Sequence, residues 1–302
     1  MSDDIKVRKV TPDDDFPQIR ELILSTKKRF YNDPRLSVIC AEELKDSYTN
    51  SNLGFVAEKY GRMVGFMGLT LGTSSPNGYL EYGVAENQTE ALKQMIQSCC
   101  NAIQLKKGNK LYYFATMPFG QVRNQEITLL EQHGFISDEY SQISTHFHLP
   151  DWKEPENLNT DGIVPLANAK KNDIITMLIE DGEELQAEQF SKQYSNLSSE
   201  AVLLSMFNSY GQIAGFAYYK VKALNPSNND LSAVAFGIHF RANVSKADKK
   251  RLIQAALLSM RQLNIIHVNS MVTLKKFDNF VLMVREGFDD YMANTLRLKL
   301  TI

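Results

Sequence analysis

Cysteine is scarce in this sequence. Of its 302 residues three are cysteines, Cys40, Cys99 and Cys100, and two of them are adjacent. Three thiols with this spacing do not make a disulfide framework, so the composition predicts reduced thiols and a cytoplasmic protein. The N-terminus lacks the basic-then-apolar order of a secretion signal, and no apolar run approaches the roughly 20 residues that cross a bilayer. No membrane partner is therefore expected.

An excess of charge of one sign is also missing. Lys and Arg total 33, Asp and Glu total 35, and the net charge is −2 at pH 7. Because proteins that bind nucleic acid mainly through its phosphates carry a basic excess, nucleic acid is not expected as a partner. With 43% hydrophobic residues, the chain can bury ordinary cores, and its 302 residues correspond to about two domains.

The sequence repeats itself at the scale of a domain. YGRMVGF at 60–66 has a counterpart in YGQIAGF at 210–216, and LLEQHGF at 129–135 has a weaker one in LMVREGF at 282–288. The offsets are 150 residues, from 60 to 210, and 153 residues, from 129 to 282. A period this long is that of a whole domain and not of a solenoid unit.

A polar stretch separates the two halves. PDWKEPENLNTDG at 150–162 is rich in proline, asparagine and acids, which is typical of a linker. The sequence therefore predicts two similar domains, at 1–150 and 158–302.

Both halves contain the same order of expected elements. Hydrophobic periodicity and turn residues predict, in the first half, a strand, a helix, a hairpin around a Tyr-Gly turn, a central strand, a long helix, a strand, a helix and a closing strand. The segments are IKVRKV, TPDDDFPQIRELI, GFVAEKYGRMVGFMGLTLG, GYLEYGV, ENQTEALKQMIQSCCNAIQL, KLYYFAT, NQEITLLEQHGF and SQISTHFHL, the last completing the first sheet. The second half repeats this order from VPL to IIHVNSMVT.

Three helix starts carry capping signals. Thr11 predicts an N-cap for the first helix, and Asn87 with Glu90 three residues later predicts a capping box for the first long helix. Ser245 with Asp248 predicts the same for the second long helix. Neither long helix has a glycine at its joint with the preceding strand, where glycines commonly let backbone N–H groups reach a phosphate.

The order of these elements resembles the GNAT superfamily of N-acetyltransferases. The resemblance covers nearly the whole chain, once per half, and the motifs that carry it are VGF at 64–66, AGF at 214–216, Gly134-Phe135 and Gly287-Phe288. It implies an α/β (α+β) fold with two tandem GNAT-like domains, each a mixed, mostly antiparallel sheet flanked by helices.

The resemblance also implies acetyl-CoA as co-substrate. In the family the pantetheine arm binds the edge of a splayed central strand, and the pyrophosphate binds the start of the long helix in an Arg/Gln-x-x-Gly-x-Gly/Ala loop. Gln88 takes the first position of this pattern, Ala91 stands at the first glycine and Lys93, which does not match, at the second. The cofactor-binding residues implied here are Val84, Ala85, Gln88, Thr89, Ala91, Leu92 and Lys93.

Two alternatives to phosphate binding stay open. A helix capped by Asn87 and Glu90 would occupy the N–H groups that a pyrophosphate needs. In the second half a cluster of cations crowds the helix start, either as a solvated face or as a phosphate site that would relieve their repulsion by the helix dipole. These cations are Lys246, Lys249, Lys250 and Arg251.

Glu81 on the central strand is the candidate general base. In the family, a glutamate on that strand, or a water that it holds, deprotonates an amine that attacks the thioester directly. The family's tyrosine acid stands four residues before the Gly-Phe glycine, but this chain has Leu130 and Met283 there. Three tyrosines lie nearby in sequence on expected strands: Tyr82, Tyr112 and Tyr113.

His146 and His148 have the spacing of two metal ligands on one strand face. Zinc or iron would need a third ligand, so a solvated histidine pair without a metal is the expectation.

Two functions from different classes follow. The first is an acetyl-CoA-dependent N-acetyltransferase that transfers acetyl directly to an unidentified primary amine on a small molecule or peptide, with the first half active. The second is a catalytically degenerate GNAT-like protein that binds acyl-CoA or a partner, which the missing glycines and tyrosines favour. A homodimer is a further expectation.

Overall fold

Two packing units make up the chain. The structure is a computed structural model that describes residues 5–31, 39–72, 76–165, 171–194, 201–225, 230–273 and 277–302. Unit 1 consists of Met1–Ser141 with Ala293–Ile302, and unit 2 of Gln142–Met292.

Unit 1 is a mixed sheet with helices on both faces. Its strands follow the order β1 (Ile5–Lys9), β2 (Leu53–Lys59), β3 (Arg62–Leu71), β4 (Gly78–Val84), β5 (Lys110–Pro118) and β12 (Asp290–Thr301). Neighbours are antiparallel except β4 and β5, which run parallel. The helices are α1 (Phe16–Phe30), α2 (Ala41–Asp46), the π-helix η2 (Ser47–Ser51), α3 (Thr89–Leu105) and α4 (Gln125–Glu131).

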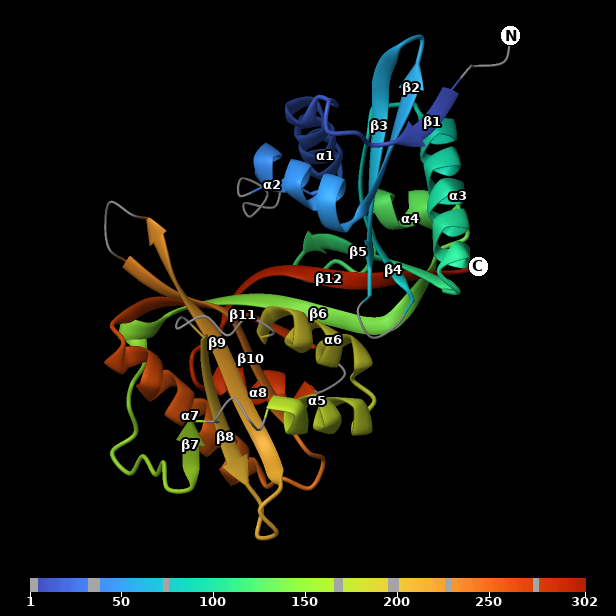
Figure 1. Cartoon of the computed structure of the whole chain (residues 1–302). Helices are drawn as coiled ribbons and strands as arrows, with labels where there is room; N and C mark the ends of the chain where they lie inside the picture. The colour runs from blue at the N-terminus through green and yellow to red at the C-terminus, as the bar shows by residue number, and fades with distance from the viewer. Residues whose placement is uncertain are drawn as a thin grey trace. The chain divides into compact units, whose positions relative to one another are not determined.

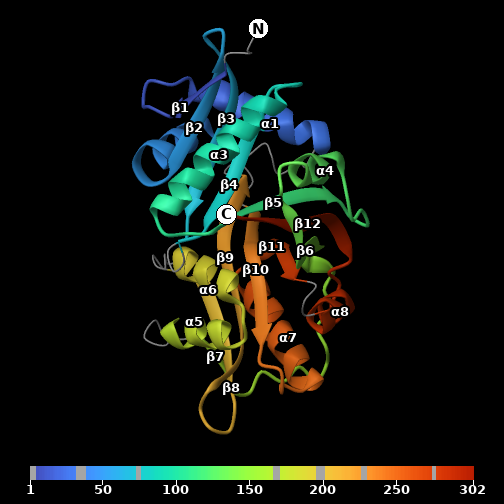
Figure 2. The ribbon, with the colours of Figure 1, turned by 90° about the vertical axis from the view of Figure 1, so that its right-hand side faces the viewer.

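Strand alternation gives unit 1 two cores. Phe55 and Ala57 of β2 face a core built with α3 and α4, whereas Val56 between them faces a core built with α1, α2 and η2. Helices α3 and α1 therefore cover opposite faces of the same sheet (Figures 1 and 2). The two-residue turn between β2 and β3 is at Tyr60 and Gly61, with φ of 53° and 73°, the hairpin turn that the sequence predicts.

Unit 2 repeats this plan. Its strands follow the order β6 (Ile136–His148), β11 (Ile265–Thr273), β10 (Asp230–Phe240), β9 (Ile213–Asn225), β8 (Ala201–Phe207) and β7 (Ile163–Pro165). The helices are α5 (Lys171–Glu180), α6 (Glu184–Tyr194), α7 (Lys246–Gln262), α8 (Phe277–Arg285) and the 3₁₀ turn η3 (Leu149–Asp151). One core lies under α7 and α8, and another under α5 and α6. The predicted fold class, two similar units with mixed, mostly antiparallel sheets flanked by helices, is confirmed.

Each unit takes its last strand from the other half of the sequence. Residues 142–148 of β6 pair with β11 in unit 2, so the prediction that SQISTHFHL completes the first sheet is wrong. Residues 293–301 of β12 pair with β5 instead. The alternation of side chains specifies the buried face of a strand but not its partner. The domain boundaries 1–150 and 158–302 follow the repeat, and packing assigns these two strand segments to the opposite unit.

The first helix begins later than Thr11 predicts. Asp15 is the N-cap of α1, and its side chain accepts from the N–H of Gln18 at 2.9 Å. Arg8 holds Asp14 through two hydrogen bonds of 2.6 and 2.9 Å. Thr11 donates its N–H to Asp14 as well. The prediction of Thr11 as N-cap is wrong because these contacts within residues 8–14 hold the segment in a turn.

Cleavage of the 150–162 linker should leave the two pieces associated. The first piece keeps 142–148, which belongs to unit 2, and the second keeps 293–301, which belongs to unit 1. Limited trypsin digestion at Lys153, followed by gel filtration, should give one species of near-intact size that separates only in denaturant. A Lys153→Gln variant should resist this cut. Two pieces that elute separately in native buffer would contradict the exchanged pairing.

Candidate functional site

The central strand of unit 1 separates from its parallel neighbour. β4 pairs with β5 only at Gly78–Leu111 and Tyr79–Tyr112. Its other edge pairs with β3 as far as Val84. Figure 2 shows β4 and β5 running apart beyond this point. Residues 80–84 therefore have one strand edge that β5 does not use.

Helix α1 covers the end of this open edge. The N–H of Val84 donates to Thr26 Oγ1 at 2.8 Å, and its carbonyl accepts from Thr26 Oγ1 at 3.0 Å and from Arg29 at 2.7 Å. Backbone groups of alternate residues point to the same edge of a strand, so Leu80 and Tyr82 share it. A ligand that adds to this edge meets Leu80 and Tyr82 first, because α1 already satisfies Val84.

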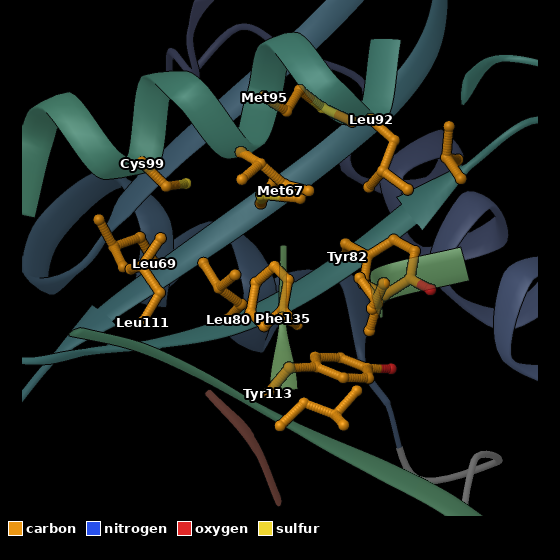
Figure 3. Packing of buried hydrophobic residues seen from close by; sticks show 14 of the residues in the cluster. Met67, Leu69, Leu80, Tyr82, Leu92, Met95, Cys99, Leu111, Tyr113 and Phe135 are labelled. Atoms are coloured by element: carbon orange, nitrogen blue, oxygen red, sulfur yellow. The ribbon is translucent and has the colours of Figure 1, made fainter. Parts of the chain in front are cut away.

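A buried acid and two phenols lie on the α3 side of the opening. Glu126, in the first turn of α4, is 3% exposed. Its Oε1 accepts from Tyr113 at 2.5 Å and from Tyr82 at 3.2 Å. Burial raises the pKa of the Glu126 carboxyl, although the bonds from Tyr113 and Tyr82 act to lower it. The two rings lie side by side, 5.2 Å apart (Figure 3).

Sequence reasoning missed Glu126. It reads there as an ordinary acid in the first turn of a helix, where acids are common because of the helix dipole. Its partners stand 13 and 44 residues away, a separation that carries no local signal.

Glu81 faces the opposite side of the sheet from Tyr82. Its carboxylate lies 3.5 Å from Lys27 Nζ on α1 and accepts from the Tyr48 hydroxyl of η2 at 3.3 Å. Burial, and then the charge of Glu81, raise the pKa of Tyr48, so this phenol stays protonated and donates. The Glu81 side chain is 29% exposed. It is therefore reachable from the α1 and α2 face.

The start of α3 has no side-chain cap among the described residues. Gln88 occupies the N-cap position without a capping bond, and Asn87 precedes it with φ of 60°. Glu90 accepts from Gln94 at 3.1 Å. The predicted capping box is wrong, because the left-handed backbone at Asn87 moves it out of the extended conformation that an N-cap requires. The first-turn N–H groups of α3 are thus open to a ligand.

The other predicted cofactor residues cluster at this helix start. Ala85 donates its N–H to Val64 of β3 at 2.9 Å, and Leu92 donates to Gln88 within the helix at 3.2 Å. The Ala91 and Leu92 side chains are buried in the core. Thr89 and Lys93 are exposed at the first turns, as is Glu90 between them.

Several solved structures share this architecture over nearly the whole chain. A tandem GNAT protein from the clavulanic acid biosynthesis pathway matches at TM-score 0.65 and 11% identity, covering 99% of this chain and 98% of that one. A GCN5-related N-acetyltransferase from Sphaerobacter thermophilus matches at 0.66 and 15%, covering 98% and 95%. Saccharomyces cerevisiae N-myristoyltransferase with bound myristoyl-CoA matches at 0.54 and 12%, covering 99% and 83%.

The chain has the tandem GNAT fold. No family model and no curated protein matches the sequence. Among the described helices, none is both long and apolar enough to cross a membrane.

The tyrosine that the GNAT resemblance predicts is absent from both units. Leu130 and Met283, at the positions where the family's tyrosine is expected, are each 1% exposed and belong to the cores. Glu126 lies one turn before Leu130 on α4. In unit 1 the Glu126 carboxyl, which accepts from Tyr82 and Tyr113, therefore lies one helical turn from the Leu130 position.

The second unit differs from the first at two places: the strand position of Glu81 and the start of the long helix. Gly65 pairs with Val84 in unit 1, and its counterpart Gly215 pairs with Phe240 in unit 2. Three residues before these partners stand Glu81 in unit 1 and Gly237 in unit 2. Ser245 caps α7 by accepting from the N–H of Asp248 at 3.1 Å, as the sequence predicts. Unit 2 thus has no carboxylate at this strand position, and a side chain already fills its helix start.

Acids neutralise most of the basic cluster at the start of α7. Three ion pairs do so: Lys249 with Asp278 at 2.5 Å, Arg251 with Asp248 at 3.0 Å and Lys250 with Glu286 at 3.8 Å. These pairings favour a structural role for the cluster over phosphate binding.

Glu126→Gln should gain stability relative to the wild type as pH rises. Burial raises the Glu126 pKa, so the folded chain retains a proton that the unfolded chain releases. The protonated Glu126 therefore contributes fully to the stability of the wild type below the pKa of a glutamate in the unfolded chain, about 4.3. This stabilisation is lost as pH rises through the pKa of Glu126 in the folded chain. The glutamine keeps an oxygen acceptor for Tyr113 and has no proton to lose.

Urea unfolding of both proteins from pH 4.5 to 8.5 measures this difference. Glu43→Gln, on the exposed side of α2, is the control and should show no such trend. A difference between Glu126→Gln and wild type that stays constant over this range would contradict a raised Glu126 pKa.

Proposed function

We propose that the protein is an acyl-CoA-dependent N-acyltransferase, with acetyl-CoA as donor and a primary amine as acceptor, and that unit 1 carries the reaction. The observation that carries this is the open edge of β4, which has Glu81 on one face of the sheet and the Tyr82–Tyr113–Glu126 cluster on the other. An amine and a thioester can meet at such an opening from opposite faces.

The sequence at the start of α3 lacks the glycines of a diphosphate site, but the backbone there favours one. Three first-turn N–H groups, of residues 89–91, lack a side-chain cap, and Lys93 is exposed one turn further on. Uncapped N–H groups and the helix dipole together favour an anion. Glu90 opposes it through its negative charge. We assign the pyrophosphate to the exposed backbone at Thr89 and to Lys93.

Side-chain size favours a short acyl group. Bound acyl-CoA supplies an activated thioester carbonyl, and its acyl chain needs space near the opening. Tyr82, Tyr113 and Phe135 fill the α3 face there and are nearly fully buried (Figure 3). This packing suits acetyl better than the long chain of the myristoyl-CoA bound to the yeast relative.

Glu81 is the proposed base. A protonated amine cannot attack a thioester, so one proton must leave before the C–N bond forms. Glu81 lies on the face that α1 and η2 cover, and its carboxylate can accept that proton directly or through a water. Lys27 and Tyr48 hold the carboxylate in place at 3.5 and 3.3 Å. We therefore expect the acceptor amine to approach from this face.

The phenols of Tyr82 and Tyr113 are the proposed acids. When the C–S bond breaks, the leaving thiolate takes one proton. Both phenols lie on the α3 side, and burial raises their pKa, so they remain protonated. The Glu126 carboxyl, whose pKa is also raised, can return the proton to either phenol through the hydrogen bonds that join them.

A catalytically degenerate protein that binds acyl-CoA or a partner is the second candidate. It is favoured by the hydrogen bonds of Thr26 and Arg29 to Val84, which occupy part of the strand edge that pantetheine uses in the family. Binding of acetyl-CoA without turnover on any amine would select this candidate.

Glu81→Gln should lower turnover by about 10²–10⁴ at neutral pH, because removal of a positioned base typically has this effect. Affinity for acetyl-CoA should remain nearly unchanged. The loss should shrink as pH rises, since the amine then deprotonates without help. Release of free CoA thiol, measured with a panel of amines from pH 6 to 9, provides the test. Glu43→Gln is the matched control, and undiminished turnover in Glu81→Gln would exclude Glu81 as the base.

Charge changes at the start of α3 should alter acetyl-CoA affinity in opposite directions. Removing a charge near a helix terminus changes binding by roughly 0.3–1 kcal/mol, or about twofold to fivefold. Glu90→Gln should tighten binding and Lys93→Gln should weaken it. Lys106→Gln, at the far end of α3, should leave affinity unchanged. Calorimetric titration gives the dissociation constants. If Lys106→Gln changes the affinity as much as Glu90→Gln and Lys93→Gln do, the pyrophosphate binds elsewhere.

A further inference from the structure

Three histidines of unit 2 lie on one face of a strand pair. His146 and His148 alternate along β6, and His267 of β11 stands directly opposite His148 in the antiparallel register. The His267 ring centre lies 5.2 Å from that of His146 and 5.6 Å from that of His148. The third imidazole, which the His146–His148 spacing lacks in the sequence, comes from a strand about 120 residues further along the chain, since 121 residues separate His146 from His267.

Two of the ring nitrogens already stand at the separation of metal ligands. His146 Nε2 lies 3.1 Å from His267 Nδ1. Two nitrogens bound to one zinc ion at about 2.1 Å and a tetrahedral angle lie about 3.4 Å apart. A shift of a few tenths of an ångström would therefore seat both on one ion.

Carboxylates lie beside the Nδ1 atoms of both β6 histidines. Asp290 Oδ2 lies 3.4 Å from His146 Nδ1, and Asp151 Oδ2 lies 3.0 Å from His148 Nδ1. In both rings Nδ1 therefore faces a carboxylate and Nε2 is left for a ligand. Metal-binding histidines almost always direct their second nitrogen to such an acceptor, which fixes the tautomer and raises the basicity of the ligand.

We propose that His146, His148 and His267 bind a divalent transition-metal ion such as Zn²⁺ or Ni²⁺. As the side chains stand, no three donors among the described residues converge on one point. The His148 side chain is 45% exposed and can rotate, exchanging its Asp151 contact for the ion, whereas Asp290 keeps its place beside His146. Three imidazoles suit Zn²⁺, Ni²⁺ and Cu²⁺, and water takes the fourth position.

The site links the first half of the sequence to the second within unit 2. Residues 142–148 precede the linker and β11 follows it, so an ion bound by both strands holds β6 onto β11. Binding to the folded state alone stabilises it in proportion to the logarithm of ion concentration above the dissociation constant. Metal should therefore stabilise this strand pair, independently of any acyl transfer in unit 1.

Titration of the untagged full-length chain with ZnCl₂ and with NiCl₂ at pH 7.5 tests the site. One ion per chain should bind, and His146→Gln and His267→Gln should each weaken binding at least tenfold. Asp290→Asn should weaken it by about 10–100-fold if the carboxylate orients His146. His133→Gln, in unit 1, is the matched control and should bind as the wild type does.

A thermal melt gives a second measurement on the same proteins. Zn²⁺ should raise the melting temperature of the wild type and of His133→Gln but not that of His267→Gln. The proposal is overturned if no saturable binding of one ion per chain occurs, or if His133→Gln weakens binding as much as the cluster variants do. It is also overturned if bound Zn²⁺ stabilises His267→Gln as much as the wild type.

Discussion

The separation of β4 from β5 beyond Tyr79 and Tyr112 is the constraint on which the candidate site depends. A strand edge in the middle of a sheet leaves backbone groups without a ladder, and each such group is costly if it stays unpaired away from water. The protein satisfies the outermost pair with Thr26 and Arg29 of α1. The remaining edge, at the Leu80 carbonyl and Tyr82, is where the proposed acyl-CoA would pair through its own amides. The open edge is thus a structural liability that the proposed function turns into a binding site.

Because a strand has a period of two, adjacent residues of β4 serve opposite faces of this opening. Glu81 meets α1 and η2, and Tyr82 meets α4 through Glu126. The sheet itself thereby keeps the proposed base and the proposed acid apart, so neither neutralises the other. In unit 2 the corresponding strand has Gly237 in place of the carboxylate, and Ser245 caps the helix. The two units share a fold but not the groups to which we assign acyl transfer.

The sequence allowed the order of elements to be predicted, because periodicity and turns such as Tyr60-Gly61 are local. The fold class followed from the resemblance of that order to the GNAT superfamily. Helix caps at Thr11 and Asn87 were mispredicted, since an ion pair between Asp14 and Arg8 and a left-handed backbone at Asn87 decided them. Strand partners could not be predicted from alternation alone. The Glu126 cluster and the third histidine, His267, join residues far apart in sequence, so no local pattern could show either. Glu81 was placed on its strand, but Lys27 and Tyr48 became visible only in three dimensions.

The exchange of last strands also sets the order in which the chain can be completed during synthesis. Unit 1 begins at the N-terminus, yet its β5 edge stays unpaired until residues 293–301 leave the ribosome, after all of unit 2 has been made. Domains usually fold in the order of their synthesis, and an unpaired strand edge in a nascent chain is prone to aggregation. Here the first unit to be translated is the last to close. Loss of residues 293–301 would therefore damage the N-terminal unit, far from the lesion in sequence.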